Sequence, residues 1–317
     1  MSLLVVGSVA LDTVETPYGS IEEELGGSAV YFSLAASQFS RVRLVGVVGR
    51  DFPQAYLDRL ASLHIDLAGL QHVEGETFRW HGAYEGRMEQ ARTVEVRLNV
   101  FERFIPAIPA DYADSRYVFL ANGSPTTHMH VLEQVDRPKF VLADTMDFYI
   151  QNERDALLQL MERIDGLILN DMEALQLSGE AHLLGAARWI CQHGPSWCIV
   201  KKGEHGSLLR APQGFFVLPG FPHESVVDPT GAGDAFAGGL MGYVASKDAV
   251  DLETLEFGLV YGTITASFAI GRLGPAGLEG LTHEAMQERL DEFLASCRLL
   301  RSQENAVGEL DWTAPAL

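Results

Sequence analysis

The sequence predicts an α/β fold, a three-layer α/β/α sandwich with a mainly parallel central sheet. Short runs of β-branched and other apolar residues alternate with amphipathic helical patterns along most of the 317 residues. Such alternation is typical of a sheet with helices on both faces. Two stretches, 12–25 and 76–100, break the rhythm because their strand patterns surround Gly and Pro turns with no helix between them. We expect these stretches to form a small β-sheet outside the main one.

The elements are expected in a regular order from the N-terminus. Apolar strands are predicted at LLVV (3–6), RLVGVVG (43–49), YVFLA (117–121), KFVLAD (139–144), GLILN (166–170) and FFVLPGF (215–221). Helices are predicted at 29–39, 55–63, 127–135, 152–163 and from 235 onward. Residues 1–317 are expected to form one domain, with the small sheet as its lid. A hairpin that only extends the edge of the main sheet is the alternative for that lid.

The composition excludes several classes of protein. No apolar run approaches the roughly 20 residues that span a bilayer, and the N-terminus lacks a basic segment before its first strand, so a cytoplasmic protein is expected. A net charge of -20 argues against binding to nucleic acid, which needs a basic face. The three cysteines have no CxxC spacing, so neither a disulfide framework nor a zinc site is indicated.

The segment DPTGAGDAFAGG (228–239) indicates an anion site beside a carboxylate. Gly231, Ala232 and Gly233 have little or no side chain, and the helix predicted after them begins with unpaired N–H groups that attract anions. Asp234 next to an anion costs electrostatic energy, which suggests chemistry. If the helix end holds a transferring phosphoryl group, Asp234 is placed to accept the proton of an attacking hydroxyl.

Other candidate residues follow the strands, where ligands bind in open α/β sheets. Asp12 can accept hydrogen bonds from two neighbouring hydroxyls, although a surface aspartate of the lid is equally compatible. Gly26 and Gly27 allow close approach of a ligand, with Ser28 as a helix cap. Asp51 follows the strand RLVGVVG, where a capping role is the alternative.

A metal site is indicated by LILNDMEALQL, in which Asn170 ends a strand and Glu173 lies in the first helical turn. One amide and one carboxylate on the same face suit a hydrated Mg²⁺, which keeps most of its waters. A helix cap with Glu at its third position has the same pattern. The residues alone leave both interpretations open.

Taken together, these motifs resemble the ribokinase-like, or PfkB, carbohydrate kinases. DPTGAGDAFAGGLM looks like the family signature, and the other motifs keep the family's order over nearly the whole chain: Asp12, GG at 26–27, GRD at 49–51, NDME at 170–173 and VKKGEHG at 200–206. The resemblance implies a transfer of the γ-phosphoryl group of ATP, with Mg²⁺, to an alcohol of a sugar or nucleoside.

The resemblance also implies a role for each matching residue. Asp234 would be the catalytic base and Gly231–Gly233 the anion hole, while Asn170 and Glu173 would organise Mg²⁺ through water. The acceptor would meet Asp12, Gly26, Gly27 and Asp51. The nucleotide would meet Lys201, Gly203, Gly206, Ala266, Ser267 and Gly274. In some members the counterparts of Asp228 and Thr230 hold a monovalent cation such as K⁺.

Departures from the family pattern bear on the acceptor. Many sugar kinases show DxNxR after the strand that here is KFVLAD, whereas this chain has DTMDF, with Phe148 in place of the arginine. Gln54 also replaces a common glycine. A neutral acceptor is therefore favoured over an anionic one. Aromatic side chains of the lid are compatible with stacking on a sugar or base, and equally with packing against the lid of a second subunit in a homodimer.

Three alternatives remain for the function. A non-catalytic sugar or nucleoside sensor of the same fold would be expected to lose Asp234 or the GAG turn, and both are intact. A hydroxymethylpyrimidine-like acceptor would fit the same motifs. A dinucleotide-dependent dehydrogenase would show a glycine fingerprint after the first strand, yet GSVALD has one glycine.

Overall fold

The central sheet has nine strands, in a computed structural model that describes residues 2–88 and 91–297. In sheet order they are β13 (Gly214–Leu218), β12 (Ser207–Ala211), β11 (Trp197–Lys201), β10 (Gly166–Asn170), β9 (Phe140–Asp144), β8 (Tyr117–Leu120), β1 (Ser2–Val6), β4 (Arg41–Val48) and β5 (Ile65–His72). All neighbours pair in parallel except at one edge, where β12 is antiparallel to β11 and to β13. The mainly parallel sheet predicted from the sequence is confirmed.

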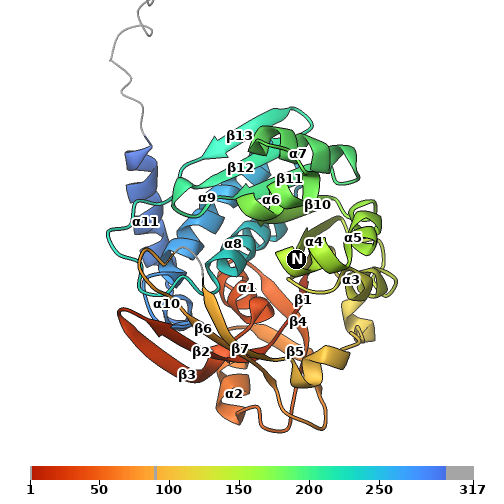
Figure 1. The fold of residues 1–317 in the computed structure, drawn as a ribbon, viewed down its shortest axis with the longest axis vertical. Coiled ribbons are helices and arrows are strands. Elements are labelled where there is room, and N and C mark those ends of the chain that lie inside the picture. Colours follow the sequence, from red (N-terminus) through yellow and green to blue (C-terminus); the bar gives the residue numbers. More distant parts are fainter. Residues whose placement is uncertain (1, 89–90, 298–317) are drawn as a thin grey trace, which may run out of the picture.

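Helices cover both faces of this sheet, as the alternation of β1 shows. Leu3 and Val5 pack in one buried cluster and Leu4 and Val6 in another, because successive side chains of a strand point to opposite faces. The first cluster includes residues of α1 (Ser28–Ala36), α2 (Gln54–Ser62), α8 (Ala232–Lys247), α9 (Leu252–Ala269), α10 (Ala276–Glu279) and α11 (His283–Ser296). The second includes residues of α3 (Pro125–Leu132), α4 (Asp147–Asn152), α5 (Arg154–Met161), α6 (Asp171–Ser178) and α7 (Leu183–Gln192). Figure 1 shows the two groups on either side of the strands.

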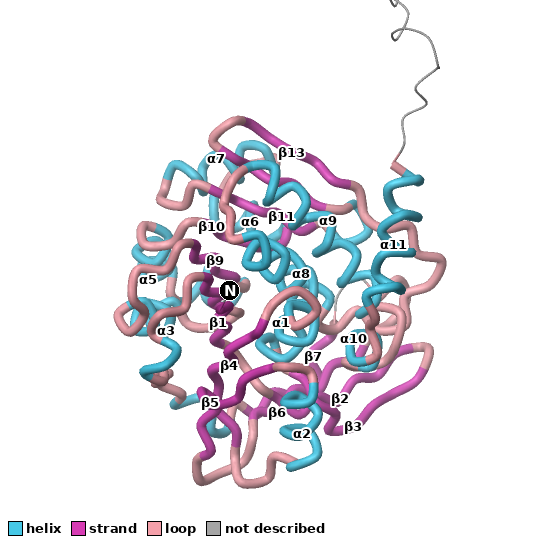
Figure 2. The backbone as a smooth tube through the Cα atoms, turned by 180° about the vertical axis from the view of Figure 1, so that it is seen from behind, coloured by secondary structure: helices cyan, strands magenta, loops and turns pink. Residues whose placement is uncertain are grey.

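A separate sheet of four strands forms the expected lid. Its order is β3 (Gly19–Gly26), β2 (Ala10–Thr16), β6 (Phe78–Ala83) and β7 (Arg92–Arg97). Strand β2 pairs antiparallel with β3 and parallel with β6, and β6 pairs antiparallel with β7. The lid lies beside α1 and α10 in both views (Figures 1 and 2). Because these strands pair with one another and not with the main sheet, the alternative of a simple edge hairpin is wrong.

Two local expectations differ from the structure. The helix expected at 152–163 corresponds to α5, which begins after Glu153, and a further short helix that was not predicted, α4, lies before it, separated by Glu153 with φ -128° and ψ 32°. Ser28 does not cap α1, because the cap position is Gly27 and the Ser28 hydroxyl instead lies 3.0 Å from that of Ser8. Cys191, Cys198 and Cys297 are free thiols. In the described ranges, no helix has the length and apolar character needed to cross a bilayer.

Candidate active site

Three neighbouring strands end with polar side chains at the same edge of the main sheet. The last residues of β9, β10 and β11 are Asp144, Asn170 and Lys201. The Lys201 Nζ lies 2.8 Å from Oδ2 of Asp144, and the side chains are 18% and 5% exposed. Because parallel strands place their carboxyl ends together, motifs far apart in the sequence meet at this edge.

The segment GAG forms the start of α8 between an aromatic ring and a cation. Gly231 precedes the helix with φ 72°, a left-handed conformation that glycine adopts without strain. A Cβ at position 231 would lie 2.2 Å from Cγ of Tyr31, and one at 233 would lie 3.2 Å from Nζ of Lys201. Glycine is therefore required at position 231, whereas a side chain at 233 would press on the flexible end of Lys201.

Asp234 lies in the first turn of α8, directly after these residues. Burial raises the pKa of its carboxyl to about 8, and the negative charge of Asp144 adds to the rise while Lys201 opposes it. A general base works best when its pKa is close to the operating pH, so this environment suits proton transfer.

Asn170 and Glu173 cap α6 reciprocally. The Asn170 Oδ1 accepts from Glu173 N at 2.8 Å, and Oε2 of Glu173 accepts from Asn170 N at 2.7 Å. Burial, with Asp144 nearby, raises the pKa of Glu173 to about 7. The helix-cap interpretation of Asn170 and Glu173 is therefore correct, and it does not exclude a role in binding Mg²⁺ through water. In the described part of the chain, no group of three or more His, Cys, Asp or Glu residues is arranged to hold a metal ion directly. This donor set fits only an ion bound largely through its waters.

Asp12 lies where the lid joins the glycines that precede α1. It belongs to β2, is 4% exposed, and its Oδ2 accepts a hydrogen bond from Gly27 N at 3.3 Å. A Cβ at Gly26 would lie only 1.9 Å from the same oxygen. Burial raises the pKa of Asp12 to about 7, against the effect of the Gly27 hydrogen bond. The interpretation of Asp12 as an ordinary exposed lid residue is wrong.

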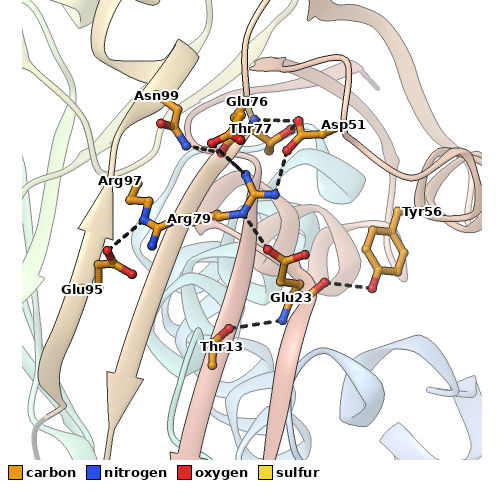
Figure 3. Close-up of polar contacts among 10 residues, drawn as sticks. All are labelled: Thr13, Glu23, Asp51, Tyr56, Glu76, Thr77, Arg79, Glu95, Arg97 and Asn99. Atoms are coloured by element: carbon orange, nitrogen blue, oxygen red, sulfur yellow. Dashed lines mark hydrogen bonds and ion pairs between the residues drawn. The ribbon is translucent and has the colours of Figure 1, made fainter.

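Both carboxylate oxygens of Asp51 are bound by lid residues (Figure 3). Its Oδ1 accepts from N and Oγ1 of Thr77 at 2.8 and 2.7 Å, and Oδ2 lies 2.8 Å from Nη2 of Arg79. Burial opposes ionisation, but these hydrogen bonds and the Arg79 charge lower the pKa of Asp51. Asp51 does not cap α2, whose cap position is Pro53. Its observed contacts tie the β4–α2 turn to β6.

Arg79 is the centre of this polar group. Its Nε lies 2.7 Å from Oε1 of Glu23, and its Nη1 donates to Thr77 O at 3.2 Å. The side chain is only 20% exposed, so it connects β3, β6 and the β4–α2 turn (Figure 3). This role was not predicted, because an arginine in a lid strand carries no local pattern that reveals its partners.

The expected nucleotide residues other than Lys201 lie on the turn after β11, on α9 and at Gly274. Gly203 begins a short 3₁₀ turn after β11 and Gly206 follows it, and Lys202 N donates to Gly206 O at 2.8 Å across the turn. Ser267 is 3% exposed, and its hydroxyl donates to Ile264 O at 2.6 Å, whereas Ala266 is partly exposed. The Ser267 hydroxyl also accepts from Nη1 of Arg289 at 3.3 Å, so it is engaged both within α9 and with α11.

Asp228 links the segment before α8 to Gly274. It is 1% exposed, and it accepts from Thr230 N at 2.9 Å and from Gly274 N at 2.8 Å. The Thr230 hydroxyl donates to Tyr84 Oη at 3.2 Å. These contacts fix the loop that leads into Gly231 and the start of α8.

Comparison with known proteins identifies the family. The model of the "pfkB family carbohydrate kinase" matches residues 2–277. The chain belongs to the pfkB family of carbohydrate kinases. A "Cytidine kinase" of Thermococcus kodakarensis is 31% identical over 250 residues, which cover 77% of this chain and 88% of that protein. This pfkB-family protein is a kinase that uses an alcohol group as acceptor, as predicted.

Solved structures with the same fold extend the comparison. A nucleoside kinase of Burkholderia thailandensis in complex with inosine superimposes with a TM-score of 0.78 at 20% identity, covering 92% of this chain and 97% of that one. An aminoimidazole riboside kinase of Salmonella enterica, complexed with aminoimidazole riboside and an ATP analog, gives 0.74 at 19% identity, covering 92% and 100%. The pfkB-family kinase therefore has the predicted ribokinase-like fold.

Besides Arg79, two residues of the site were not predicted, although the sequence carried a signal for one of them. Asp144 ends a predicted strand, so the rule that selected Asn170 applies equally to it. Tyr31 lies in the middle of an apolar helical run, and its position beside Gly231 depends on how α1 packs against α8.

Proposed function

We propose that this pfkB-family kinase transfers the γ-phosphoryl group of ATP to a hydroxyl of a nucleoside or a related small, neutral sugar-containing acceptor. The 31% identity to a cytidine kinase supports the nucleoside class. Phe148 at the position of the family's arginine supports a neutral acceptor, since a cation that would meet an anionic group is missing there. A hydroxymethylpyrimidine-like acceptor is the alternative, and the acceptor panel described below distinguishes it from nucleosides and sugars.

In the proposed mechanism, Asp234 accepts the proton of the attacking hydroxyl while the N–H groups of Gly231, Ala232 and Gly233 receive the transferring group. The first turn of a helix supplies such donors without reorganisation. Asp12, Gly26 and Gly27 contact the acceptor from the side of the lid, and Asp51 acts on it through the lid contacts of Thr77 and Arg79. The lid excludes water, which limits hydrolysis of ATP.

The nucleotide is proposed to lie against Lys201, Gly203, Gly206, Ala266, Ser267 and Gly274. Asn170 and Glu173 would hold Mg²⁺ through its waters, and the ion would neutralise charge on the phosphates. Asp228 and Thr230 are proposed for a monovalent cation such as K⁺. The observation that carries the whole proposal is Asp234, placed at the start of α8 with a pKa of about 8 next to small residues.

The test is ADP release by the purified chain with ATP, Mg²⁺ and K⁺ across free sugars, sugar phosphates, nucleosides and a hydroxymethylpyrimidine. Asp234→Asn should remove most turnover but change nucleotide affinity by only a few-fold, because the base acts in the transition state. Asp291→Asn, an exposed position on α11, is the matched control and should behave as wild type. Equal loss of turnover and nucleotide affinity in Asp234→Asn would refute the proposed base.

The lid also supports a proposed homodimer. Val94 and Val96 on its outer strand β7 are 44% and 48% exposed, which leaves apolar surface for a second lid. Light scattering of the wild type and of Val96→Glu tests this. A monomeric wild type would rule the dimer out.

A further inference from the structure

Strand β3 of the lid contains a bulge directly beside Asp12. Along β2, Asp12 pairs with Glu24 and Val14 pairs with Ile21. Two residues of β3 therefore lie opposite the single residue between Asp12 and Val14. One of the two, Glu23, has φ 49°, in the left-handed region that residues other than glycine rarely adopt. Bulges next to active sites redirect side chains, and strain of this kind persists only where the surrounding contacts hold it.

The bulge sets the register of the end of β3. Regular pairing would place Leu25 opposite Ala10, but the extra residue places Gly26 there. A Cβ on Gly26 would lie 1.9 Å from Oδ2 of Asp12, so a leucine in that place would collide with the carboxylate. The same register brings Gly27 N to 3.3 Å from this oxygen, to which it donates. The buried position of the Asp12 carboxylate therefore depends on the bulge.

Contacts from three different elements hold Glu23 in this conformation (Figure 3). Its N–H donates to Oγ1 of Thr13 on β2 at 3.2 Å, and its carbonyl oxygen accepts from Oη of Tyr56 on α2 at 3.1 Å. Its carboxylate oxygen Oε1 lies 2.7 Å from Nε of Arg79 on β6. The two hydrogen bonds fix the peptide groups on either side of the left-handed residue, and the ion pair fixes its side chain.

Arg79 connects this bulge to the β4–α2 turn. Its Nη2 lies 2.8 Å from Oδ2 of Asp51 in that turn, while its Nε binds Glu23. The planar guanidinium group serves both carboxylates at once, in directions that its shape fixes. The side chain of Arg79 is 20% exposed and that of Glu23 is 54% exposed, so the less exposed group fixes the more exposed one. Arg79 thus holds the bulge in a fixed position relative to Asp51.

Building on the proposed kinase activity, we propose that Arg79 is a positioning residue for the acceptor, which holds the β3 bulge at Glu23 and thereby places the Asp12 carboxylate. Arg79 acts through the backbone of β3 and does not contact the acceptor itself. Asp51 serves the same purpose one step further away, because it anchors Arg79. The effect should be selective for acceptor binding, since Asp234 lies on a different element, α8.

Two substitutions of Glu23 separate the bulge from the ion pair. Glu23→Ala and Glu23→Gly both remove the carboxylate that pairs with Arg79, but only glycine adopts φ 49° without strain. The KM for the acceptor should therefore be about 10-fold higher in Glu23→Ala than in Glu23→Gly, as expected from the cost of a left-handed residue. Because Glu23 is exposed, both variants should fold. Equal values of this KM would refute the role of the bulge.

Arg79→Met tests the arginine itself. Loss of the ion pair should raise the KM for the acceptor about 10-fold, while kcat and the KM for ATP stay within a few-fold because α8 is not touched. Asp51 keeps its hydrogen bonds from Thr77, so the variant should fold. Adding Glu23→Gly should restore most of the acceptor affinity, since glycine adopts the left-handed conformation without help from the arginine. If the double variant bound the acceptor as weakly as Arg79→Met alone, our proposal would be wrong.

The matched control is Arg97, which lies opposite Arg79 on the neighbouring strand β7. Its Nε lies 2.8 Å from Oε1 of Glu95, so it also forms an ion pair within the lid (Figure 3). Arg97→Met makes the same chemical change in the same sheet but leaves the contacts of the bulge intact, so the KM for the acceptor should stay within about twofold of wild type. A rise equal to that of Arg79→Met would mean that any loss of charge from the lid has this effect, and would overturn the proposal.

Hydrogen exchange of the Gly27 N–H gives a readout that needs no acceptor. This group donates to Oδ2 of Asp12, so its protection reports whether the carboxylate is in place. Protection should fall about 10-fold in Arg79→Met and return in Arg79→Met with Glu23→Gly. Unchanged protection in Arg79→Met would refute the role of Arg79. If the variants show the expected exchange but the wild type phosphorylates no acceptor, the proposed function fails while the positioning of Asp12 by Arg79 stands.

Discussion

Replacing Asp12 by Asn should stabilise the protein at alkaline pH and weaken acceptor binding. Burial holds the pKa of Asp12 at about 7, compared with 3.8 for the exposed group. That difference of about 3 units, at about 1.36 kcal/mol each, corresponds to about 4 kcal/mol of ionisation cost in the folded protein above pH 7. The Asn oxygen can still accept from Gly27 N, but its buried NH₂ group costs about 1–3 kcal/mol. The net gain is about 1–3 kcal/mol.

The sign of the pH dependence follows from proton binding. Between pH 4 and pH 7 the unfolded chain loses the Asp12 proton while the folded chain keeps it, so the stability of the wild type falls as the pH rises through this range. Above pH 7 the destabilising contribution of Asp12 is constant. Urea denaturation without ligands at pH 4.5 and pH 8 measures the effect. Asp12→Asn should show a smaller fall than wild type. The KM for the acceptor should rise, since the carboxylate is proposed to accept its hydroxyls.

Asp66→Asn is the control, because the pKa of Asp66 is shifted in the opposite direction from that of Asp12. Burial opposes ionisation there, but hydrogen bonds that include those from Ala68 N and Arg41 lower the pKa of Asp66. A lowered folded pKa adds stability above the unfolded pKa and loses it as the pH falls, so Asp66→Asn should be less stable than wild type at pH 8. If Asp12→Asn lost stability between pH 4.5 and pH 8 as steeply as wild type, the ionisation cost would not arise at Asp12.

Two further predictions concern Glu173 and Tyr31. Glu173→Gln keeps a side-chain oxygen for Asn170 N, so thermal stability should change little. The Mg²⁺ concentration for half-maximal turnover should rise several-fold, because a carboxylate that holds the waters of the ion is lost. An unchanged Mg²⁺ dependence would contradict the metal assignment. The buried Tyr31 hydroxyl has no hydrogen-bond partner among the described residues, so Tyr31→Phe should leave the melting temperature equal or higher, since an unsatisfied polar group is removed. A lower melting temperature of Tyr31→Phe would mean that the Tyr31 hydroxyl makes a stabilising hydrogen bond in solution, for example with a buried water molecule.

The fold class was predictable because most strands and helices carry their own local pattern, although β5, β11 and β12 were not predicted as strands. The same patterns placed Asn170 and Asp234 correctly at a strand end and a helix start, since both positions are defined by the neighbouring sequence. The family resemblance then supplied roles for residues whose local sequence is ambiguous.

Contacts between distant segments could not be predicted in this way. The Asp51 carboxylate meets Arg79 only because β6 lies beside the β4–α2 turn, and Lys201 meets Asp144 only because β9 and β11 flank β10. Tyr31 lies beside Gly231 because α1 packs on α8. None of these pairings follows from periodicity or from spacing along the chain.

The parallel pairing of β2 with β6 has a consequence for the order of folding. Ala10 pairs with Phe78, 68 positions later, and β4, α2 and β5 lie in the intervening chain. Closing so long a loop costs entropy that is recovered only when the intervening elements have brought its ends together. The lid is thus expected to assemble after the neighbouring part of the main sheet, and Asp12, on β2, reaches its buried position only at that late stage.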